Sequence, residues 1–508
     1  MRKITKIIST LLAILLVLNV ACSANDLSEI QAPSINEQHE APSPSIEKTP
    51  ESQIVPDSED EENSSINDLP EIPKPGLGME FPVQGGLILH AFCWSFNTIA
   101  ENMADIAAAG FTAVQTSPIS ESITDSPWSP QPTGMQIMGD GAWWFHYQPV
   151  SYRIGNFHLG TEEEFAKMCD VANEFGVKVI VDVVANHFTS EFDKICDTVL
   201  EIEGGAVRLE NVSGSGRLQQ TRGRLLGLYD VITENPYMQQ VVLDYLERCI
   251  ELGASGFRYD AALHIELPDE HESIRSDFWT VVLENGSEFQ YGEVLDAGQA
   301  SNYARHMPVT DAFYGNMVLG AARTGRIRAA ILSEYRVNAP AAQLVTWVES
   351  HDTFCNDGVS ADLTPKQIIY GWAIIAARSD STPLFLSRPA GSSPGLETRW
   401  GNNLVGERGN DEFMSREITA LNWFKRAMFG SDELLTNPIE ENFNLMMIQR
   451  GNNGVVIINT GNEVILESIE AELLEDGIYV DIIAGNEFVV YGGKISGIVN
   501  AESITVIY

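Results

Sequence analysis

Short apolar runs alternate with amphipathic segments along most of the chain. Runs such as "GLILHAF", "FTAVQTSP" and "VKVIVDVVANH" have the length and the β-branched content of buried strands. The segments between them space their apolar residues as helices do, and examples such as "NPYMQQVVLDYLERCIELG" end in a glycine that stops a helix. Repeated alternation of this kind predicts an α/β fold, and its extent over residues 84–389 predicts a closed (β/α)8 TIM barrel. An open doubly wound sheet is the alternative.

Two further segments depart from this rhythm. Residues 188–229 follow the third predicted strand and contain the Gly- and Ser-bearing run "EGGAVRLENVSGSGRLQQTRG". Loops of this length in a compact fold are usually functional, so we expect an inserted domain here. Residues 390–508 carry short strands joined by Asn-Gly and Gly-Asn turns, which predict a separate C-terminal antiparallel β-sandwich.

The N-terminal part has a different character. Residues 1–22 combine a basic start with an apolar core and end in Ala21-Cys22, which resembles a lipoprotein-type signal peptide with Cys22 as the lipidated residue. Cleavage after Ala24 without lipidation is the alternative. Residues 23–83 are rich in Pro, Ser, Asp and Glu, which predicts a disordered tether. We therefore expect an extracellular protein, anchored to the outer face of the cell membrane only through its N-terminal lipid.

Charge and cysteine content narrow the classes of partner. The chain of 508 residues has 31 Lys and Arg against 71 Asp and Glu, a formal charge of -40. This balance argues against nucleic acid or an anionic membrane surface as a partner, because both select basic patches. The chain lacks a CxxC pair and a GxGxxG after the first predicted strand, so zinc and nucleotide sites have no support. Buried free thiols are expected, with one disulfide as the alternative, and a monomer is the default.

Four predicted strands end in charged or polar residues. In barrels of this kind the reactive side chains lie at the carboxyl ends of the strands. The third strand leads to Asp182, Asn186 and His187, the fourth to Arg258 and Asp260, the fifth to Glu293, and the seventh to His351 and Asp352. A single acidic strand end is usually a structural ion pair or a loop cap. Four that converge predict a catalytic site.

The carboxylates in this set suit glycosidic cleavage. A retaining glycosidase uses one ionised carboxylate as nucleophile and a second, protonated one as general acid, about 5 Å apart. Arg258 lies two residues before Asp260 and therefore on the same face of the strand. We expect this cation to lower the pKa of Asp260 and keep it ionised.

Four short segments carry a resemblance to a known family. "DVVANH", "GFRYDAALH", "GEVL" and "ESHD", in this order, resemble the four signature segments of the α-amylases, glycoside hydrolase family 13. "HIELPDE" and "LLGLYD" resemble most the saccharifying α-amylases of bacteria. The resemblance implies Asp260 as the nucleophile, Glu293 as the acid/base and Asp352 as the group that binds sugar hydroxyls and stabilises the transition state. It implies endo-hydrolysis of α-1,4-glucosidic bonds in starch, glycogen or malto-oligosaccharides.

The same resemblance implies substrate contacts and a calcium ion. The side chains of Asn186 and Asp230 and the main-chain carbonyls of Thr221 and His264 match calcium ligands, and hard oxygen donors are what Ca²⁺ prefers. The implied substrate-binding residues are Trp143, Trp144, Gln148, His187, Arg258, Leu263, His264 and His351.

Two positions depart from the family pattern. Leu263 stands where the family has a lysine that reaches the sugar on the leaving-group side, so we expect altered product length. Arg258 and Arg388 match chloride-binding positions of the animal enzymes, but Ser350 replaces their asparagine, so we expect no chloride requirement. Leu263 also keeps open a transglycosylating or maltogenic enzyme of the same family. A non-catalytic glucan-binding lipoprotein is the alternative from another class.

Overall fold

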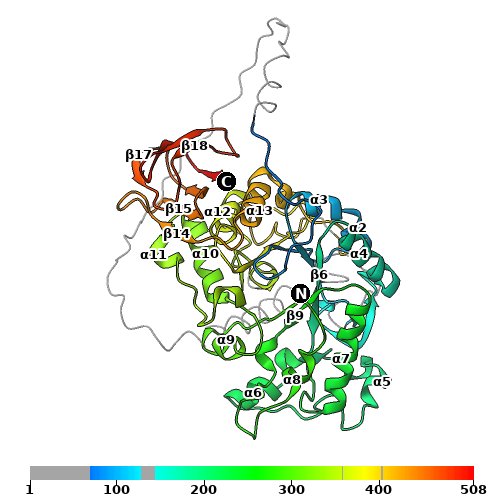
Figure 1. Cartoon of the computed structure of the whole chain (residues 1–508). Helices are drawn as coiled ribbons and strands as arrows, with labels where there is room; N and C mark the ends of the chain where they lie inside the picture. Colours follow the sequence, from blue (N-terminus) through cyan, green and yellow to red (C-terminus); the bar gives the residue numbers. More distant parts are fainter. Residues whose placement is uncertain (1–68, 127–142, 357, 402–403) are drawn as a thin grey trace, which may run out of the picture. The chain divides into compact units, whose positions relative to one another are not determined.

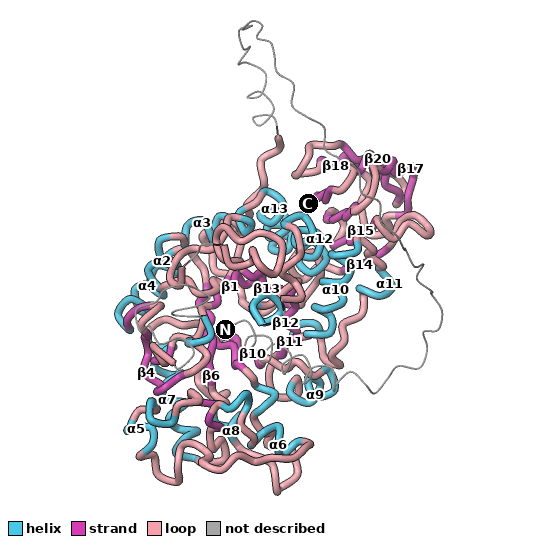
Figure 2. The backbone as a smooth tube through the Cα atoms, turned by 180° about the vertical axis from the view of Figure 1, so that it is seen from behind, coloured by secondary structure: helices cyan, strands magenta, loops and turns pink. Residues whose placement is uncertain are grey.

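The core of the protein is a closed barrel of eight parallel strands. The computed structural model describes residues 69–126, 143–356, 358–401 and 404–508. Around the barrel the strands follow the order β1-β13-β12-β11-β10-β9-β6-β2 (Figures 1 and 2). Their bounds are β1 (Ile88–His90), β2 (Ala113–Gln115), β6 (Lys178–Val184), β9 (Gly256–Asp260), β10 (Phe289–Gly292), β11 (Val309–Thr310), β12 (Leu344–Trp347) and β13 (Thr382–Leu386). The predicted (β/α)8 barrel is confirmed, and the open sheet is excluded.

The barrel interior changes from apolar to polar along its axis. Ile88, Ala113, Ile180, Phe289 and Leu384 belong to one buried cluster inside the barrel. Toward the carboxyl ends of the strands, the buried side chains are polar or charged: His90, Gln115, Asp182 and Arg258. Since a buried charge is costly unless it is paired, this end must hold its charges in mutual contact.

Helices surround the barrel and bury one face each. The helix α4 (Glu162–Glu174) begins with a capping box between Thr161 and Glu164, and α12 (Pro365–Ala376) begins with one between Thr364 and Gln367. The other helices are α2 (Phe96–Glu101), α3 (Met103–Ala108), α5 (Asp197–Leu200), α6 (Arg217–Arg222), α7 (Pro236–Glu251), α8 (Phe278–Val282), α9 (Ala297–Tyr303), α10 (Ala312–Thr324), α11 (Ala329–Leu332) and α13 (Arg416–Ala427).

Two insertions follow the second and third barrel strands. The first contains a sheet of β3 (Ser120–Ser122), β4 (Pro149–Asn156) and β5 (Gly160–Thr161). The second begins and ends in a strand pair, because β7 (His187–Phe188) is antiparallel to β8 (Tyr229–Asp230). Helices α5 and α6 lie within this second insertion, at the end of the molecule away from the C-terminal strands (Figure 1).

The C-terminal region is a sandwich of two antiparallel sheets, as predicted. One sheet has the order β14-β15-β16-β21 and the other β17-β20-β19-β18. Apolar side chains of both sheets, among them Leu445, Ile457, Phe488 and Ile495, form one buried cluster. The strands are β14 (Glu433–Thr436), β15 (Leu445–Arg450), β16 (Gly454–Asn459), β17 (Val464–Glu470), β18 (Gly477–Val480), β19 (Glu487–Val490), β20 (Lys494–Val499) and β21 (Ser503–Ile507).

The predicted boundary between barrel and sandwich at residue 389 is too early. Helix α13 lies beyond this boundary but packs on the barrel helices. Asn422 accepts a hydrogen bond from Trp372 of α12 (2.9 Å) and donates one to the Ala109 carbonyl beside α3 (2.9 Å). Helix α13 therefore sits between the last and the first barrel units. A long Gly- and Ser-containing stretch separates this helix from β13, so the sequence pattern did not link it to the barrel.

The predicted tether is also shorter than residues 23–83, because residues 69–83 are packed against the folded body. Tyr508 donates a hydrogen bond to the Pro73 carbonyl (2.6 Å), and Glu80 pairs with Lys178 at the start of β6 (3.2 Å). Val83 is fully buried. Carbonyl groups of a proline-rich segment can accept hydrogen bonds that composition does not reveal. The predictions for residues 1–68 lie outside the described residues.

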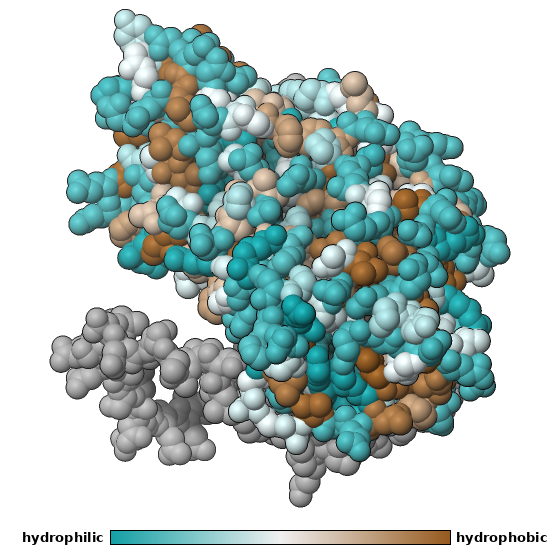
Figure 3. All heavy atoms as spheres, turned by 60° about the horizontal axis from the view of Figure 1, so that its bottom comes forward, coloured by the Kyte–Doolittle hydropathy of each residue, from teal (hydrophilic) through white to brown (hydrophobic). Residues whose placement is uncertain are grey.

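The helix lengths, the surface and the cysteines of the described residues bear on where the protein can act. In the described ranges, no helix has the length and hydropathy needed to cross a membrane. On the face in Figure 3, hydrophobic residues form separate small groups within a hydrophilic surface. The cysteines Cys93, Cys169, Cys196, Cys249 and Cys355 are all free thiols, and all but Cys196 are buried.

Candidate active site

Carboxylates from several strands meet at one end of the barrel, around Arg258. Its Nη1 donates to both oxygens of Asp182 in β6 (2.7 and 2.9 Å) and to Asp260 Oδ1 (2.9 Å). Its Nη2 lies 2.5 Å from Glu293 Oε1, and Glu293 directly follows β10. One guanidinium thus joins carboxylates from three neighbouring strands. The predicted convergence of Asp182, Asp260 and Glu293 is present in the fold.

Asp352 completes the group from a fourth strand. It begins the helical turn η6 (Asp352–Asn356) that follows β12, and burial and the nearby charge of Glu293 raise its pKa. Its side chain is 27% exposed, whereas those of Asp260 and Glu293 are each 11% exposed. The three carboxyls therefore lie together, and each keeps a small part of its side chain exposed.

The carboxylates in this cluster outnumber the one guanidinium that they share. The expectation that Arg258 lowers the pKa of Asp260 therefore does not hold. Burial raises the pKa of Asp260, and the nearby Arg258 opposes this rise without cancelling it. Burial likewise raises the pKa of Asp182 to about 7 and, together with the charge of Glu293, raises that of Asp352 well above its usual range. Arg258 is shared among several carboxylates, so it does not lower the pKa of Asp260 below its ordinary value. The free cluster favours retention of a proton among its carboxyls.

The turn after Asp260 is strained and points at Glu293. Ala261 adopts the left-handed conformation (φ 49°, ψ 33°), which is uncommon for a residue with a Cβ. Its backbone N–H donates to Glu293 Oε2 (3.0 Å). Such strain persists only where the surroundings impose it, and it concentrates at functional sites. The turn thereby connects the predicted nucleophile and the predicted acid through one residue.

Aromatic rings border the carboxylates. His351 stacks on Tyr147 (ring centroids 5.1 Å apart) and on Phe92 (5.9 Å), and the Trp143 ring meets it edge-on (6.0 Å). Trp144 instead meets Phe145 edge-on (4.5 Å) and packs against a neighbouring apolar cluster. Trp143 therefore adjoins the carboxylates through His351, and Trp144 also packs against the apolar cluster that contains Trp143 and Phe92.

The sequence analysis missed two residues of this site. The Tyr147 hydroxyl donates to Asp182 Oδ2 (2.9 Å), and its carbonyl lies 3.1 Å from His187 Nε2. His90, at the end of β1, is fully buried beside His351 (5.4 Å between ring centroids). Burial and the charge of Arg258 lower the pKa of His90 to about 3. The position of His90 at a strand end was a usable signal, whereas Tyr147 lies in an irregular segment and gave none.

The remaining predicted substrate residues belong to the second insertion or contact it. Gln148 Oε1 accepts hydrogen bonds from Thr189 Oγ1 (2.9 Å) and the Ser190 N–H (3.3 Å), so this side chain holds the loop after β7. Burial lowers the pKa of His187 to about 4, which keeps it neutral. Leu263 and His264 belong to the short helix η4 (Ala262–His264), where His264 Nδ1 lies 2.8 Å from the Gln220 carbonyl.

The residues expected to bind calcium are brought together in two pairs. The β7–β8 pairing places Asn186 beside Asp230, since the Asn186 carbonyl accepts a hydrogen bond from the Val231 N–H (2.9 Å). The contact between His264 and Gln220 places His264 beside Thr221. The charged form of His264 contributes to lowering the pKa of His187, the neighbour of Asn186.

The chemistry of these donors fits calcium. Asn186 Oδ1 is buried and accepts no hydrogen bond from any described residue. Burial raises the pKa of Asp230 to about 8 against the opposing charge of Arg208, which lies 2.9 Å away. An orphaned amide oxygen and a carboxylate short of positive charge are suitable ligands for a hard cation. Among the described residues no group of three or more His, Cys, Asp or Glu side chains could hold a metal, so a cation held here would also need main-chain oxygens.

Comparison with known proteins agrees with this geometry. Residues 91–201 match the family described as "Alpha amylase, catalytic domain". The chain is 40% identical over 471 residues to an α-amylase of Butyrivibrio fibrisolvens, a match that covers 84% of the chain and 47% of that protein. It is 32% identical over 440 residues to an α-amylase of Clostridium acetobutylicum, covering 83% of the chain and 54% of that protein. The chain thus spans about half the length of these two relatives.

A solved structure shares the fold. The wild-type α-amylase I from Eisenia fetida matches with a TM-score of 0.64 at 20% identity, covering 85% of this chain and 99% of that one. At this identity the likeness concerns the fold alone. Together with the two relatives and the matching catalytic-domain family, it confirms the resemblance found in the four sequence segments. The catalytic-domain match and the two α-amylase relatives thus support membership of the α-amylase family, glycoside hydrolase family 13.

Proposed function

We propose that the chain is an α-amylase that hydrolyses internal α-1,4-glucosidic bonds of starch, glycogen or malto-oligosaccharides with retention of configuration. The observation that carries the proposal is the joint hold of Arg258 on Asp260 and Glu293, with bonds of 2.9 and 2.5 Å. Two carboxylates held on one guanidinium are near neighbours, as a retaining mechanism requires. The α-amylases among the relatives support the same activity.

In this mechanism Asp260 attacks the anomeric carbon while Glu293 protonates the leaving oxygen, and a glycosyl-enzyme ester forms. Glu293 then takes a proton from water, which displaces Asp260 from the sugar. Asp352 binds ring hydroxyls and stabilises the positive charge that develops in each transition state. Arg258 stays charged throughout, and it stabilises Asp260 whenever this carboxylate is free and ionised.

Calcium would be held by the side chains of Asn186 and Asp230 and by the carbonyls of Thr221 and His264. When bound, it supplies cross-linking of the second insertion to the barrel and takes no part in proton transfer. The residues of this chain perform the chemistry.

The place of action is the outside of the cell. The apolar N-terminal segment and Cys22 support export and a lipid anchor, with residues 23–68 as the spacer. A polymer too large to enter the cell suits an enzyme that is held at its outer face.

The test compares the parent with Asp260→Asn and Glu293→Gln in a timed digest of soluble starch with calcium present. Both variants should lose about three orders of magnitude or more in kcat. Matched controls are Asp362→Asn and Glu502→Gln, whose exposed carboxylates pair with Arg323 and Lys366 on the surface. These controls should keep parent activity. Proton NMR of the fresh products should show the α-anomer first. The β-anomer first, or full activity of either active-site variant, would refute the proposal.

One observation favours a second candidate. Leu263 offers only an apolar, half-buried side chain where the family has a hydrogen-bonding lysine. A weakened acceptor side changes how water and sugar compete for the glycosyl-enzyme. Products longer than the malto-oligosaccharide supplied would identify a transglycosylating enzyme, and their absence in the digest would leave hydrolysis.

A further inference from the structure

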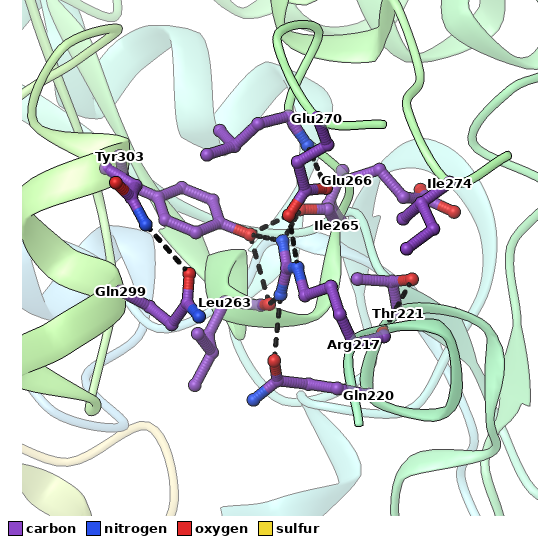
Figure 4. Close-up of polar contacts among 12 residues, drawn as sticks. Arg217, Gln220, Thr221, Leu263, Ile265, Glu266, Glu270, Ile274, Gln299 and Tyr303 are labelled. Carbon is purple, nitrogen blue, oxygen red and sulfur yellow. Dashed lines mark hydrogen bonds and ion pairs between the residues drawn. The ribbon is translucent and has the colours of Figure 1, made fainter. Parts of the chain in front are cut away.

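Arg217 of the second insertion binds the backbone of the segment that follows Asp260. Its Nη1 donates to the Leu263 carbonyl (2.6 Å) and its Nη2 to the Ile265 carbonyl (3.2 Å). Its Nε pairs with Glu270 (2.5 Å), which keeps the guanidinium in place. The side chain of Arg217 is only 14% exposed. Figure 4 shows the guanidinium between the hydroxyl of Tyr303 and the carbonyls of the segment.

Tyr303 of α9 holds the same two carbonyls from the other side. Its ring is fully buried, and its hydroxyl lies within hydrogen-bond distance of the Leu263 carbonyl (3.0 Å) and of the Ile265 carbonyl. The hydroxyl also accepts a hydrogen bond from Arg217. Arg217 and Tyr303 therefore form a clamp that fixes two peptide planes of one short segment.

The other end of the clamped segment contacts Glu293. The Ala261 N–H donates to Glu293 Oε2 (3.0 Å), and the Leu263 N–H donates to the Glu293 carbonyl (3.4 Å). Within the segment the His264 N–H donates to the Ala261 carbonyl (2.8 Å), which closes the turn. Ala262 packs so closely on Gly292 that a Cβ at residue 292 would lie 2.9 Å from the Ala262 side chain.

The strain at Ala261 needs a restraint. A left-handed alanine relaxes unless its neighbours are held. Glu293 holds the segment at Ala261, and the clamp holds it at Leu263 and Ile265. Release of the clamp would let the turn relax, withdraw the Ala261 N–H from Glu293 and move Asp260, the residue before the turn.

We propose that Arg217, with Tyr303, is a positioning residue that keeps the Ala261 turn strained and so aligns Asp260 and Glu293 for the reaction. The inference rests on the proposed function, since it assigns a role within the same site. Arg217 touches none of the reacting groups. It transmits the position of the second insertion to the two carboxylates through the backbone of the clamped segment.

A second arginine in the protein makes the same kind of clamp but has no contact with the candidate site, so it serves as a matched control. Arg378 pairs with Glu433 (3.0 Å) and donates to the Tyr314 hydroxyl (2.9 Å) and to the carbonyls of Leu332 (2.7 Å) and Ser333 (2.9 Å). The chemical partners are the same as those of Arg217: a glutamate, a tyrosine hydroxyl and two carbonyls. Arg378 precedes β13, whereas the carboxylates follow or end their strands, so this clamp lies at the other end of the barrel.

The experiment compares Arg217→Gln with Arg378→Gln, and Tyr303→Phe with Tyr314→Phe, in the full chain with saturating calcium. Activity on a short malto-oligosaccharide is measured well below each variant's Tm. Arg217→Gln should lower kcat by about 10- to 100-fold with little change in KM, because small misplacements of reacting groups carry penalties of this size. Arg378→Gln should lower Tm without lowering kcat, and Tyr303→Phe should show a smaller kcat loss that Tyr314→Phe lacks.

Three outcomes would overturn the inference. The first is a loss of Tm alone in both arginine variants, which would give Arg217 a purely structural role. The second is recovery of kcat in Arg217→Gln at higher calcium, which would make metal retention its role. The third is a crystal structure of Arg217→Gln in which Ala261 keeps its left-handed conformation and its contact with Glu293. This structural comparison decides the matter even if the parent proves inactive on glucans, a result that would refute the proposed function alone.

Discussion

The carboxylate of Glu349 holds the guanidinium of Arg388 through two parallel hydrogen bonds, Nε to Oε1 at 2.7 Å and Nη2 to Oε2 at 2.8 Å. The remaining donors of Arg388 reach the carbonyls of Leu363 and Ser360, both at 2.9 Å. The guanidinium of Arg258 is likewise paired with carboxylates, those of Asp182, Asp260 and Glu293. In both cases paired carboxylates already supply the counter-charge that an added anion would bring.

We therefore predict that activity does not depend on chloride. The parent should give the same kcat/KM in chloride buffer and in an acetate buffer of equal ionic strength, both with calcium. Equal ionic strength is the control for general screening. Activation that saturates with added chloride would contradict this arrangement.

Leu263→Lys should restore a donor on the acceptor side. A hydrogen bond to or from a charged group contributes about 1.5–3 kcal/mol, which corresponds to roughly 10- to 100-fold in affinity. KM for long malto-oligosaccharides should fall and the product distribution should shift, as measured by chromatography of timed digests. Leu209→Lys is the control, because it adds the same charge to an exposed leucine of the second insertion. Identical product profiles for parent and Leu263→Lys would reject a role for Leu263 in product length.

Removal of calcium should destabilise the chain. A ligand present at about 100 times its Kd stabilises the folded state by about 2.7 kcal/mol, so a chelator should lower Tm and re-added calcium should restore it. Asn186→Ala removes the orphaned oxygen and should abolish the rise in Tm on calcium addition. Asn338→Ala, at an exposed position, is the control and should respond as the parent does. A full calcium response in Asn186→Ala would exclude this site.

Burial of Lys425 should lower the free energy of unfolding by an amount that depends on pH. It is buried between barrel and sandwich, donates to the Arg378 carbonyl (2.9 Å), and burial lowers its pKa from 10.5 to about 7, with Arg450 and Arg378 adding to this and Glu433 and Asp380 opposing it. The folded state disfavours the charged amine, so the cost is complete below pH 7 and fades as pH rises toward 10.5. Each pKa unit corresponds to about 1.4 kcal/mol.

Lys425→Met should therefore raise the free energy of unfolding most at low pH and flatten its increase above neutrality. Urea unfolding at a series of pH values gives this comparison. Lys494→Met is the control, since Lys494 pairs with Glu470 at the surface (2.7 Å). A parallel pH dependence in parent and Lys425→Met would show that the buried amine keeps its charge at no cost.

The cluster of carboxylates could be located from the sequence because strand periodicity and charge coincide there. Asp182, Asp260 and Glu293 each lie at or near the end of an apolar run, and parallel strands bring such ends together. The pKa of Asp260 could not be inferred in this way, because the sequence does not reveal how many carboxylates share Arg258. The clamp was equally hidden: Arg217 lies in an irregular insertion and acts on carbonyl groups, which every residue has.

Local strain and domain limits were the other gaps. Ala261 carries no signal for a left-handed turn, as a glycine would, since tertiary contacts impose its conformation. Helix α13 was assigned to the wrong domain because a long loop separates it from β13. Residues 69–83 were assigned to the tether because many of their contacts use backbone oxygens rather than apolar side chains.

Residues 69–83 are attached to the folded body by side-chain contacts, and a force applied to the N-terminal side of the chain would act first on these contacts. Pro73 is fastened to the last residue, Tyr508, and Glu80 to Lys178 at the first position of β6. Tension along the chain from the N-terminal side is thus taken up at the amino ends of the barrel strands and at the chain's far terminus. The carboxylates of the candidate site stand at or after the carboxyl ends of their strands, so a pull on residues 69–83 would act on the end of the barrel opposite to them.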